Sequence, residues 1–123
     1  MTDNVSPGLA TELAYFQAWT TEDFDVAMQY IADDIVCRTP GGPVTGAAAF
    51  RAFMEPFARS VVRAEVVAGF GEGDTAVLVY DTETTLVADA PGAEHVTVVD
   101  GRIAQMRIIF DRLPFDAARR AAG

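Results

Sequence analysis

Apolar residues recur at two different spacings along the chain. In the first half they return every three or four positions, and after residue 60 they alternate with polar residues or form short β-branched runs. The first spacing is typical of helices that pack with one face, and the second is typical of strands. The pattern therefore predicts helices followed by a run of strands, the order of an α+β domain whose helices pack on one face of a sheet.

Three helices are predicted in this first half. Ser6 is a favourable N-cap and Pro7 suits the first helical position, so the first helix is expected to begin there after a loose tail. Thr21 is expected to cap the second helix, with Glu22 and Asp23 in its first turn. The expected apolar stripes are Leu9, Leu13, Phe16 and Trp19 in the first helix, Phe24, Ala27, Met28 and Ile31 in the second, and Phe50, Phe53, Met54 and Phe57 in a third that opens at Gly46.

The remaining segments predict five strands and a short final helix. A β-branched run at residues 35–39 ends in Pro-Gly-Gly-Pro at residues 40–43, a strong turn signal. Asp100-Gly101 favours a two-residue hairpin. Four longer antiparallel strands are expected at residues 61–70, 75–87, 94–99 and 102–112, and a frayed helix is expected at residues 116–122.

Length and composition describe one globular domain spanning residues 1–123, half of which are hydrophobic. The net charge is −9 and every basic residue is an arginine. Such a surface repels phosphate backbones, so no nucleic acid partner is expected. No apolar run reaches the roughly 18 residues of a membrane helix, and the N-terminus has no basic, apolar leader. We therefore expect no membrane partner and a cytoplasmic location.

Motifs for metals and cofactors are missing from the sequence. Cys37 is the only cysteine and His95 the only histidine, so no cluster of Cys and His ligands can form. The sequence contains no phosphate loop, dinucleotide fingerprint or Ser-His-Asp signature. We expect no cofactor and no metal, and we interpret Cys37 as a small buried hydrophobe on a strand.

Two stretches resemble the superfamily of ketosteroid isomerases and SnoaL-like polyketide cyclases, which has the cone fold of nuclear transport factor 2. The stretch YFQAWTTEDFDVAMQYIADDIVCRTPGG (residues 15–42) is similar to the first two helices and first strand of that family, and EHVTVVDGRIAQMRIIF (residues 94–110) to its last hairpin. The resemblance implies a strongly curved antiparallel sheet, packed against three N-terminal helices, around one deep apolar pocket. Because the superfamily contains isomerases, cyclases, dehydratases, epoxide hydrolases and non-catalytic binders, it specifies the fold better than the reaction.

Three polar positions of the steroid isomerases fall on Tyr15, Thr39 and Glu94. The resemblance implies that Tyr15 and a protonated Glu94 form an oxyanion-binding pair, since the apolar site of those enzymes keeps a carboxylic acid neutral. Thr39 replaces the catalytic aspartate, and threonine cannot act as a general base at neutral pH. Simpler interpretations stay open: a core tyrosine, a strand threonine and the solvated first residue of an edge strand.

Asp81 is the candidate that could replace the missing base. It shares one strand face with Val77, Val79 and Glu83, and the resemblance places that face toward the cavity. A buried Asp81 would have a raised pKa, which suits a general base or acid. The alternative is a solvated carboxylate paired with an arginine such as Arg107.

The expected substrate-binding residues and outer sheet face complete the predicted site. The pocket is expected to be lined by Trp19, Thr39, Phe53, Met54, Phe57, Val79, Met106, Ile108 and Phe110. The outer face is expected to bear Tyr80, Thr82, His95, Thr97, Arg107 and Ile109 and to form a homodimer. Asp111 is expected off the pocket face, and Asp33 and Asp34 at the solvated end of the second helix.

These residues support three functional hypotheses. The first is a cofactor-independent enzyme that transfers a proton next to a carbonyl of an apolar, oxygenated molecule of polyketide or steroid size. The second is a binding or dimerisation domain without catalysis. The third, epoxide opening, requires an Asp-Arg-Asp set, and neither Arg38 nor Arg107 is expected to point inward.

Overall fold

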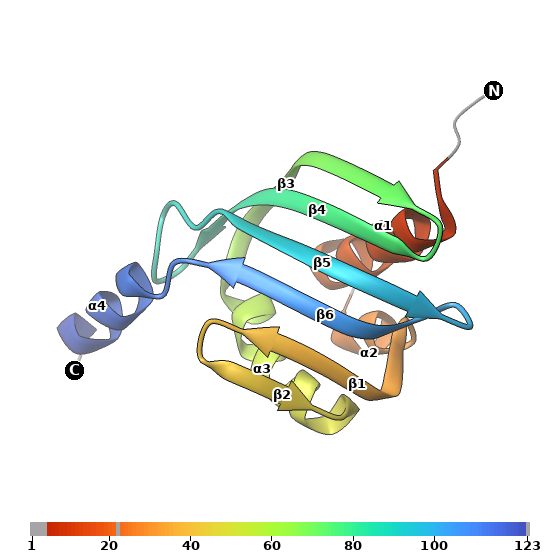
Figure 1. Ribbon diagram of the computed structural model, residues 1–123. Coiled ribbons are helices and arrows are strands. Elements are labelled where there is room, and N and C mark those ends of the chain that lie inside the picture. Colours follow the sequence, from red (N-terminus) through yellow and green to blue (C-terminus); the bar gives the residue numbers. More distant parts are fainter. Residues whose placement is uncertain (1–4, 22, 123) are drawn as a thin grey trace.

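The computed structural model describes residues 5–21 and 23–122 (Figure 1). Glu22, expected in the first turn of the second helix, lies outside the described residues. The elements are α1 (Pro7–Thr21), α2 (Phe24–Met28), β1 (Ile31–Thr39), β2 (Gly42–Thr45), α3 (Ala47–Ser60), β3 (Val61–Glu72), β4 (Thr75–Thr84), β5 (Gly92–Val99), β6 (Arg102–Phe110) and α4 (Leu113–Ala122).

The six strands form one sheet in the order β2-β1-β6-β5-β4-β3. Neighbouring strands are antiparallel except β1 and β6, which are parallel, so the sheet is mixed rather than wholly antiparallel. β3 contains two register shifts, which bend a strand and increase its twist. Figure 1 shows α1, α2 and α3 on one side of the curved sheet and α4 beyond the end of β6. The predicted α+β architecture is confirmed.

The start of α1 follows the predicted signals. The backbone N–H of Leu9 donates to Ser6 Oγ at 3.2 Å, and the helix begins at Pro7. Gly8 then lets the helix approach the turn between β3 and β4, because a Cβ at this position would lie only 2.7 Å from the carbonyl carbon of Asp74. The N–H of Gly8 donates to the Gly73 carbonyl at 2.9 Å, which fixes this helix end on the sheet.

The second helix differs from the prediction. Asp23 is the N-cap and its carboxylate accepts from the N–H of Val26 at 2.9 Å, so α2 begins two residues later than expected. A shorter α2 leaves room for a longer β1, which starts at Ile31. Asp33 and Asp34 are exposed, as predicted, but they lie in this strand.

The later boundaries differ from the predicted ones where side chains redirect the chain. β4 ends at Thr84, whose hydroxyl bonds both the N–H and the carbonyl of Val87. β2 was not predicted, and α4 begins at Leu113 rather than at residue 116. The hairpin at Asp100 and Gly101 is confirmed, with φ angles of 53° and 78°. Both angles fit a turn that needs left-handed residues.

Candidate functional site

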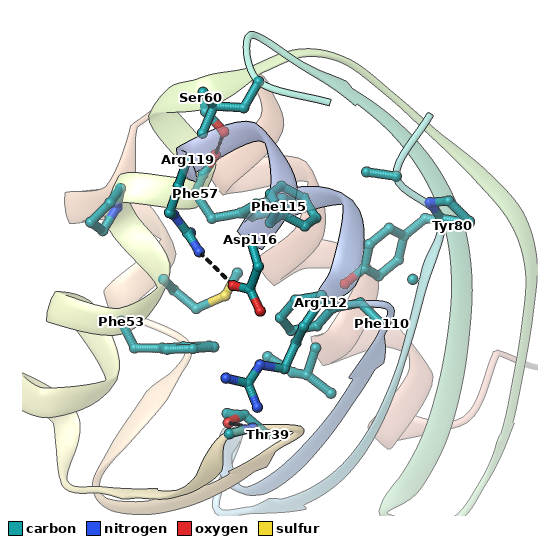
Figure 2. A pocket seen from close by; sticks show the side chains of 18 residues that line it. Thr39, Phe53, Phe57, Ser60, Tyr80, Phe110, Arg112, Phe115, Asp116 and Arg119 are labelled. Atoms are coloured by element: carbon teal, nitrogen blue, oxygen red, sulfur yellow. Dashed lines mark hydrogen bonds and ion pairs between the residues drawn. The ribbon is translucent and has the colours of Figure 1, made fainter. Parts of the chain in front are cut away.

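An apolar cleft of about 480 Å³ lies between α3, α4 and the inner face of the sheet (Figure 2). Six of the predicted substrate-binding residues line it: Thr39, Phe53, Met54, Phe57, Ile108 and Phe110. Phe115 of α4 packs edge-on against Phe57 and Phe110, with ring centroids 6.3 Å and 5.9 Å apart. The final helix therefore forms one wall of the cleft, a role that its predicted frayed end did not indicate.

Tyr80 forms the inner end of the cleft. Its side chain is almost fully buried, and Figure 2 shows its hydroxyl directed toward the cleft interior. A Cβ at Gly92 would lie 3.0 Å from the Tyr80 ring, so the glycine leaves space for this ring. Within residues 5–21 and 23–122 no protein group hydrogen-bonds the Tyr80 hydroxyl, which leaves it available to a ligand.

Polar side chains gather at the cleft mouth. The hydroxyl of Thr39 donates to the Gly42 carbonyl at 2.8 Å and accepts from the N–H of Gly41, so its hydrogen-bonding capacity serves the turn. Arg112 lies beside this turn, and Asp116 of α4 is 3.5 Å from Arg119. Asp116 is the only carboxylate among the described residues that line the cleft.

The face of β4 that points inward is the opposite of the predicted one. Ala76, Leu78 and Tyr80 are buried, whereas Asp81 is exposed and Val79 is half-buried on the outer face. The prediction that Asp81 and Val79 face the cavity is wrong, as is the placement of Tyr80 and Thr82 on the outside. Packing of α1 against β4 selects the side that carries the large Leu and Tyr side chains.

The remaining predicted residues lie in the core or on the outer face. Trp19 and Met106 are buried in the core and do not line the cleft. The ring of Trp19 lies 5.8 Å from that of Phe57, directly behind the cleft wall. His95 and Arg107 are exposed on the outer face, where they oppose one another in register. Two more outer-face residues are the exposed Ile109 and the half-buried Thr97.

A pair of acidic side chains is buried behind the cleft. Glu12 of α1 is 0% exposed and Glu94 of β5 is 1% exposed. Burial first, and then the charge of Glu94, raises the pKa of Glu12 to about 9. Burial also raises the pKa of Glu94 to about 7, and its interaction with the neighbouring Glu12 opposes that rise. The carboxyl oxygens of both residues are buried and, among the described residues, have no hydrogen-bonding partner.

Further polar groups surround this acid pair. The Tyr15 hydroxyl and Trp19 Nε1 are buried, and among the described residues they have no hydrogen-bonding partner. Burial and then the charge of Glu94 raise the pKa of Tyr15 and of Tyr80 well above the usual value, so both stay protonated. The same causes raise the pKa of Cys37, buried in β1 as predicted, to about 12.

The structure brings together only part of the predicted catalytic set. Tyr15 and Glu94 are close to each other, Asp81 is separated from them, and none of the three lines the cleft. Sequence reasoning missed Glu12, although it continues the helical spacing Gly8, Glu12, Tyr15, Trp19. An acid within that buried stripe was the available signal.

Two classes of site have no support within the described part of the chain. No group of three or more His, Cys, Asp or Glu side chains there could hold a metal ion. None of its helices has the length and apolarity needed to span a membrane.

Comparisons with known proteins agree with this geometry. A family model described as a SnoaL-like domain matches residues 13–106. A solved structure from Kribbella flavida DSM 17836 is 56% identical, with a TM-score of 0.91 and coverage of 98% of both chains. A proposed polyketide cyclase from Sinorhizobium meliloti is 22% identical, with a TM-score of 0.71 over 81% of this chain and 94% of its own. TerC, co-crystallised with polyporic acid, is 19% identical, with a TM-score of 0.71 over 94% and 99%.

Further comparisons concern the fold and the family of the chain. Solved structures of NTF2-like proteins share the fold. A search of curated proteins finds no significant match. Because the family model covers well over half of the residues, the chain belongs to the SnoaL-like domain family, as its sequence predicted.

Proposed function

We propose that the protein is a cofactor-independent enzyme that binds an apolar, oxygenated small molecule and transfers a proton next to its carbonyl group. Isomerisation, aldol-type cyclisation and dehydration all begin with this step. The family relationship supports the proposal, since one structural neighbour is a proposed polyketide cyclase and another was crystallised with polyporic acid.

The observation that carries the proposal is the position of Tyr80. Its hydroxyl points into an apolar cleft, while burial, and then the charges of Glu94 and Glu12 behind it, hold the pKa of this phenol well above its usual value. A phenol that keeps its proton can donate a hydrogen bond to a substrate carbonyl oxygen. Such a bond is worth most where charge develops on that oxygen in a site shielded from water.

Asp116 is the proposed proton acceptor. It is the carboxylate on the cleft wall, and it lies 3.5 Å from Arg119. The substrate would lie between the hydroxyl of Tyr80 and this carboxylate. The buried acids act through their effect on Tyr80 and are positioning groups.

Proton exchange on 2-tetralone tests this proposal without knowledge of the natural substrate. This apolar ketone has acidic hydrogens next to its carbonyl, and NMR in D2O measures their replacement by deuterium. We expect the protein to accelerate exchange over buffer, Tyr80→Phe and Asp116→Asn to reduce the acceleration about tenfold or more, and Asp81→Asn to preserve it. If tetralone binds and its exchange rate equals that in buffer, the catalytic proposal fails.

A second candidate function is small-ligand binding without catalysis. Two observations favour it: Asp81 is on the outer face, and the acids Glu12 and Glu94 lie outside the cleft lining. Binding of tetralone without exchange would select this function. Epoxide opening has weaker support, because the cleft offers Asp116 with Arg112 and Arg119 but lacks a second described carboxylate.

We also propose that the outer sheet face forms a homodimer, as the sequence suggested. Phe70 and Ile109 are 70% and 60% exposed there, and the exposed Arg107 and His95 lie between them. Analytical ultracentrifugation tests this part separately. Ile109→Lys should convert a dimer into a monomer, and a monomeric wild-type protein would contradict it.

A further inference from the structure

The guanidinium of Arg112 occupies the cleft mouth with very few partners. Its Nη1 lies 3.5 Å from the Pro40 carbonyl, a long contact, and it forms no ion pair with a described residue. Figure 2 shows the side chain beside Thr39 and Phe53, reaching into the cleft from the segment between β6 and α4. Most of the five N–H donors of this guanidinium therefore have no protein acceptor.

Two other arginines, Arg51 and Arg59, are paired much more tightly. Arg51 donates to Glu55 at 2.8 Å and to Asp25 at 2.7 Å, and these bonds raise its pKa. Arg59 donates to the same Glu55. Among the described residues Arg112 forms no ion pair, and its place in the cleft lining distinguishes it from other arginines without one.

The carboxylates nearest in sequence to Arg112 have other partners. The carboxylate of Asp111 accepts from the N–H of Leu113 at 3.0 Å and caps the start of α4. Asp116, across the cleft, lies 3.5 Å from Arg119. Two guanidiniums and one carboxylate line the cleft, so its local charge is positive in a chain of net charge −9.

We propose that the cleft selects amphipathic organic acids, with the ligand's carboxylate bound by Arg112 and its apolar body among Phe53, Phe57 and Phe110. A planar guanidinium pairs with a carboxylate through two parallel hydrogen bonds. Because the overall charge repels anions, the attraction has to come from this local site. The inference rests on the proposed function of the cleft, and it adds that the substrate carries an anionic group opposite the end that meets Tyr80.

A matched pair of probes separates the charge from the apolar body. We would measure the affinities of 2-naphthoate and of the isosteric, neutral 2-naphthamide by titration calorimetry, and locate binding by the NMR shift of the Met54 methyl group in the cleft. The wild-type protein should bind the acid about tenfold more tightly than the amide, the effect of about 1.4 kcal/mol from a charged hydrogen-bonded pair. Added salt should weaken only the acid.

Three variants test which residue causes the preference. Arg112→Gln should remove the preference while leaving the affinity for the amide unchanged, and Arg112→Lys should restore part of it. Arg120→Gln on α4 removes the same charge outside the cleft and should change neither affinity. A preference that survives in Arg112→Gln overturns the proposal.

The probes also distinguish this inference from the function on which it rests. If both probes bind with equal affinity and shift Met54, the small-molecule cleft stands and the anion inference fails. If neither probe binds at millimolar concentration, the proposed function and the inference fail together.

Discussion

Glu94 and Asp81 are acids on neighbouring strands, and the fold places them on opposite faces of one sheet. Glu94 is 1% exposed and lies between Leu78 and Ile108 in cross-strand register. Asp81 is exposed and opposes another acid, Glu65 of β3. Because side chains alternate along a strand, a shift of one position decides whether a carboxyl group meets the apolar core or water.

An unusual residue in a strand therefore has to be interpreted together with the face of the sheet on which it lies. An acid among valines can mark a functional group in the core or simply the solvent side of the strand. In β4 the second interpretation holds, since Asp81 and Glu83 share the outer face. In β5 the acid Glu94 lies in the core, accompanied by Glu12 from α1.

The largest expected effect is a decrease in stability with rising pH. Folded Glu12 and Glu94 keep their protons up to pKa values of about 9 and about 7, whereas in the unfolded chain they lose them near 4.5. The folded state therefore binds more protons than the unfolded state between these values. Stability is fully present below pH 4.5 and should fall by about 1.4 kcal/mol per pH unit for each such carboxyl as pH rises through this window. Urea unfolding from pH 5 to pH 8 measures the slope.

The matched controls for this slope are amide substitutions. Glu12→Gln and Glu94→Gln should each flatten it, because the substituted side chain no longer titrates. Asp81→Asn should leave it as in the wild type. A pH-independent wild-type stability between pH 5 and pH 8 would show that the acid pair is ionised and solvated in the folded protein.

The next largest effect is a loss of stability when an apolar side chain on the inner face of β4 is truncated. A truncation on the outer face of the same strand serves as the comparison. Leu78 is 0% exposed, so Leu78→Ala should cost about 2–5 kcal/mol through lost burial and the cavity left behind. Val77 is half-buried on the outer face, and Val77→Ala should cost roughly 1 kcal/mol. Urea unfolding at one pH measures both. Equal costs would contradict the assignment of the inner face.

Much of the fold was predictable because its signals are local. Ser6 and Pro7 define the start of α1 through a cap and a fixed φ angle, and Asp100-Gly101 defines a hairpin through two left-handed residues. These preferences depend on neighbouring backbone atoms and therefore survive in any context. The family resemblance then supplied the curvature and the helix-covered face of the sheet.

The site was less predictable because it depends on contacts between distant segments. In β4 both faces carry apolar residues, so alternation alone could not choose between the side of Val79 and that of Tyr80. Packing of α1 makes that choice, and α1 also brings Glu12 to Glu94. Phe115 joins the cleft only because α4 packs against Phe57 of α3 and Phe110 of β6. None of these contacts between distant segments can be recognised from a short stretch of sequence.

A smaller effect is expected at Thr82, the inner-face neighbour of Asp81. Its buried hydroxyl donates to the Ala90 carbonyl at 2.6 Å and ties β4 to the loop that leads into β5. Thr82→Val keeps the shape and removes this bond, which should cost about 1 kcal/mol. Thermal unfolding with Asp81→Asn as the control measures the difference. A neutral Thr82→Val would mean that the loop is held by its backbone bonds alone.

The smallest effect has the opposite sign and belongs to Asp81 itself. Asp81 opposes Glu65 across β3 and β4, and like charges directly opposite each other destabilise a strand pair. Asp81→Asn should therefore stabilise the protein by a few tenths of a kcal/mol at pH 7, and added salt should remove the gain by screening the two exposed charges. Glu65→Gln is the reciprocal variant, and the double variant should gain little more than either single one. A loss of stability in Asp81→Asn would instead show that this carboxylate makes a favourable contact, which would reopen its candidacy as a functional group.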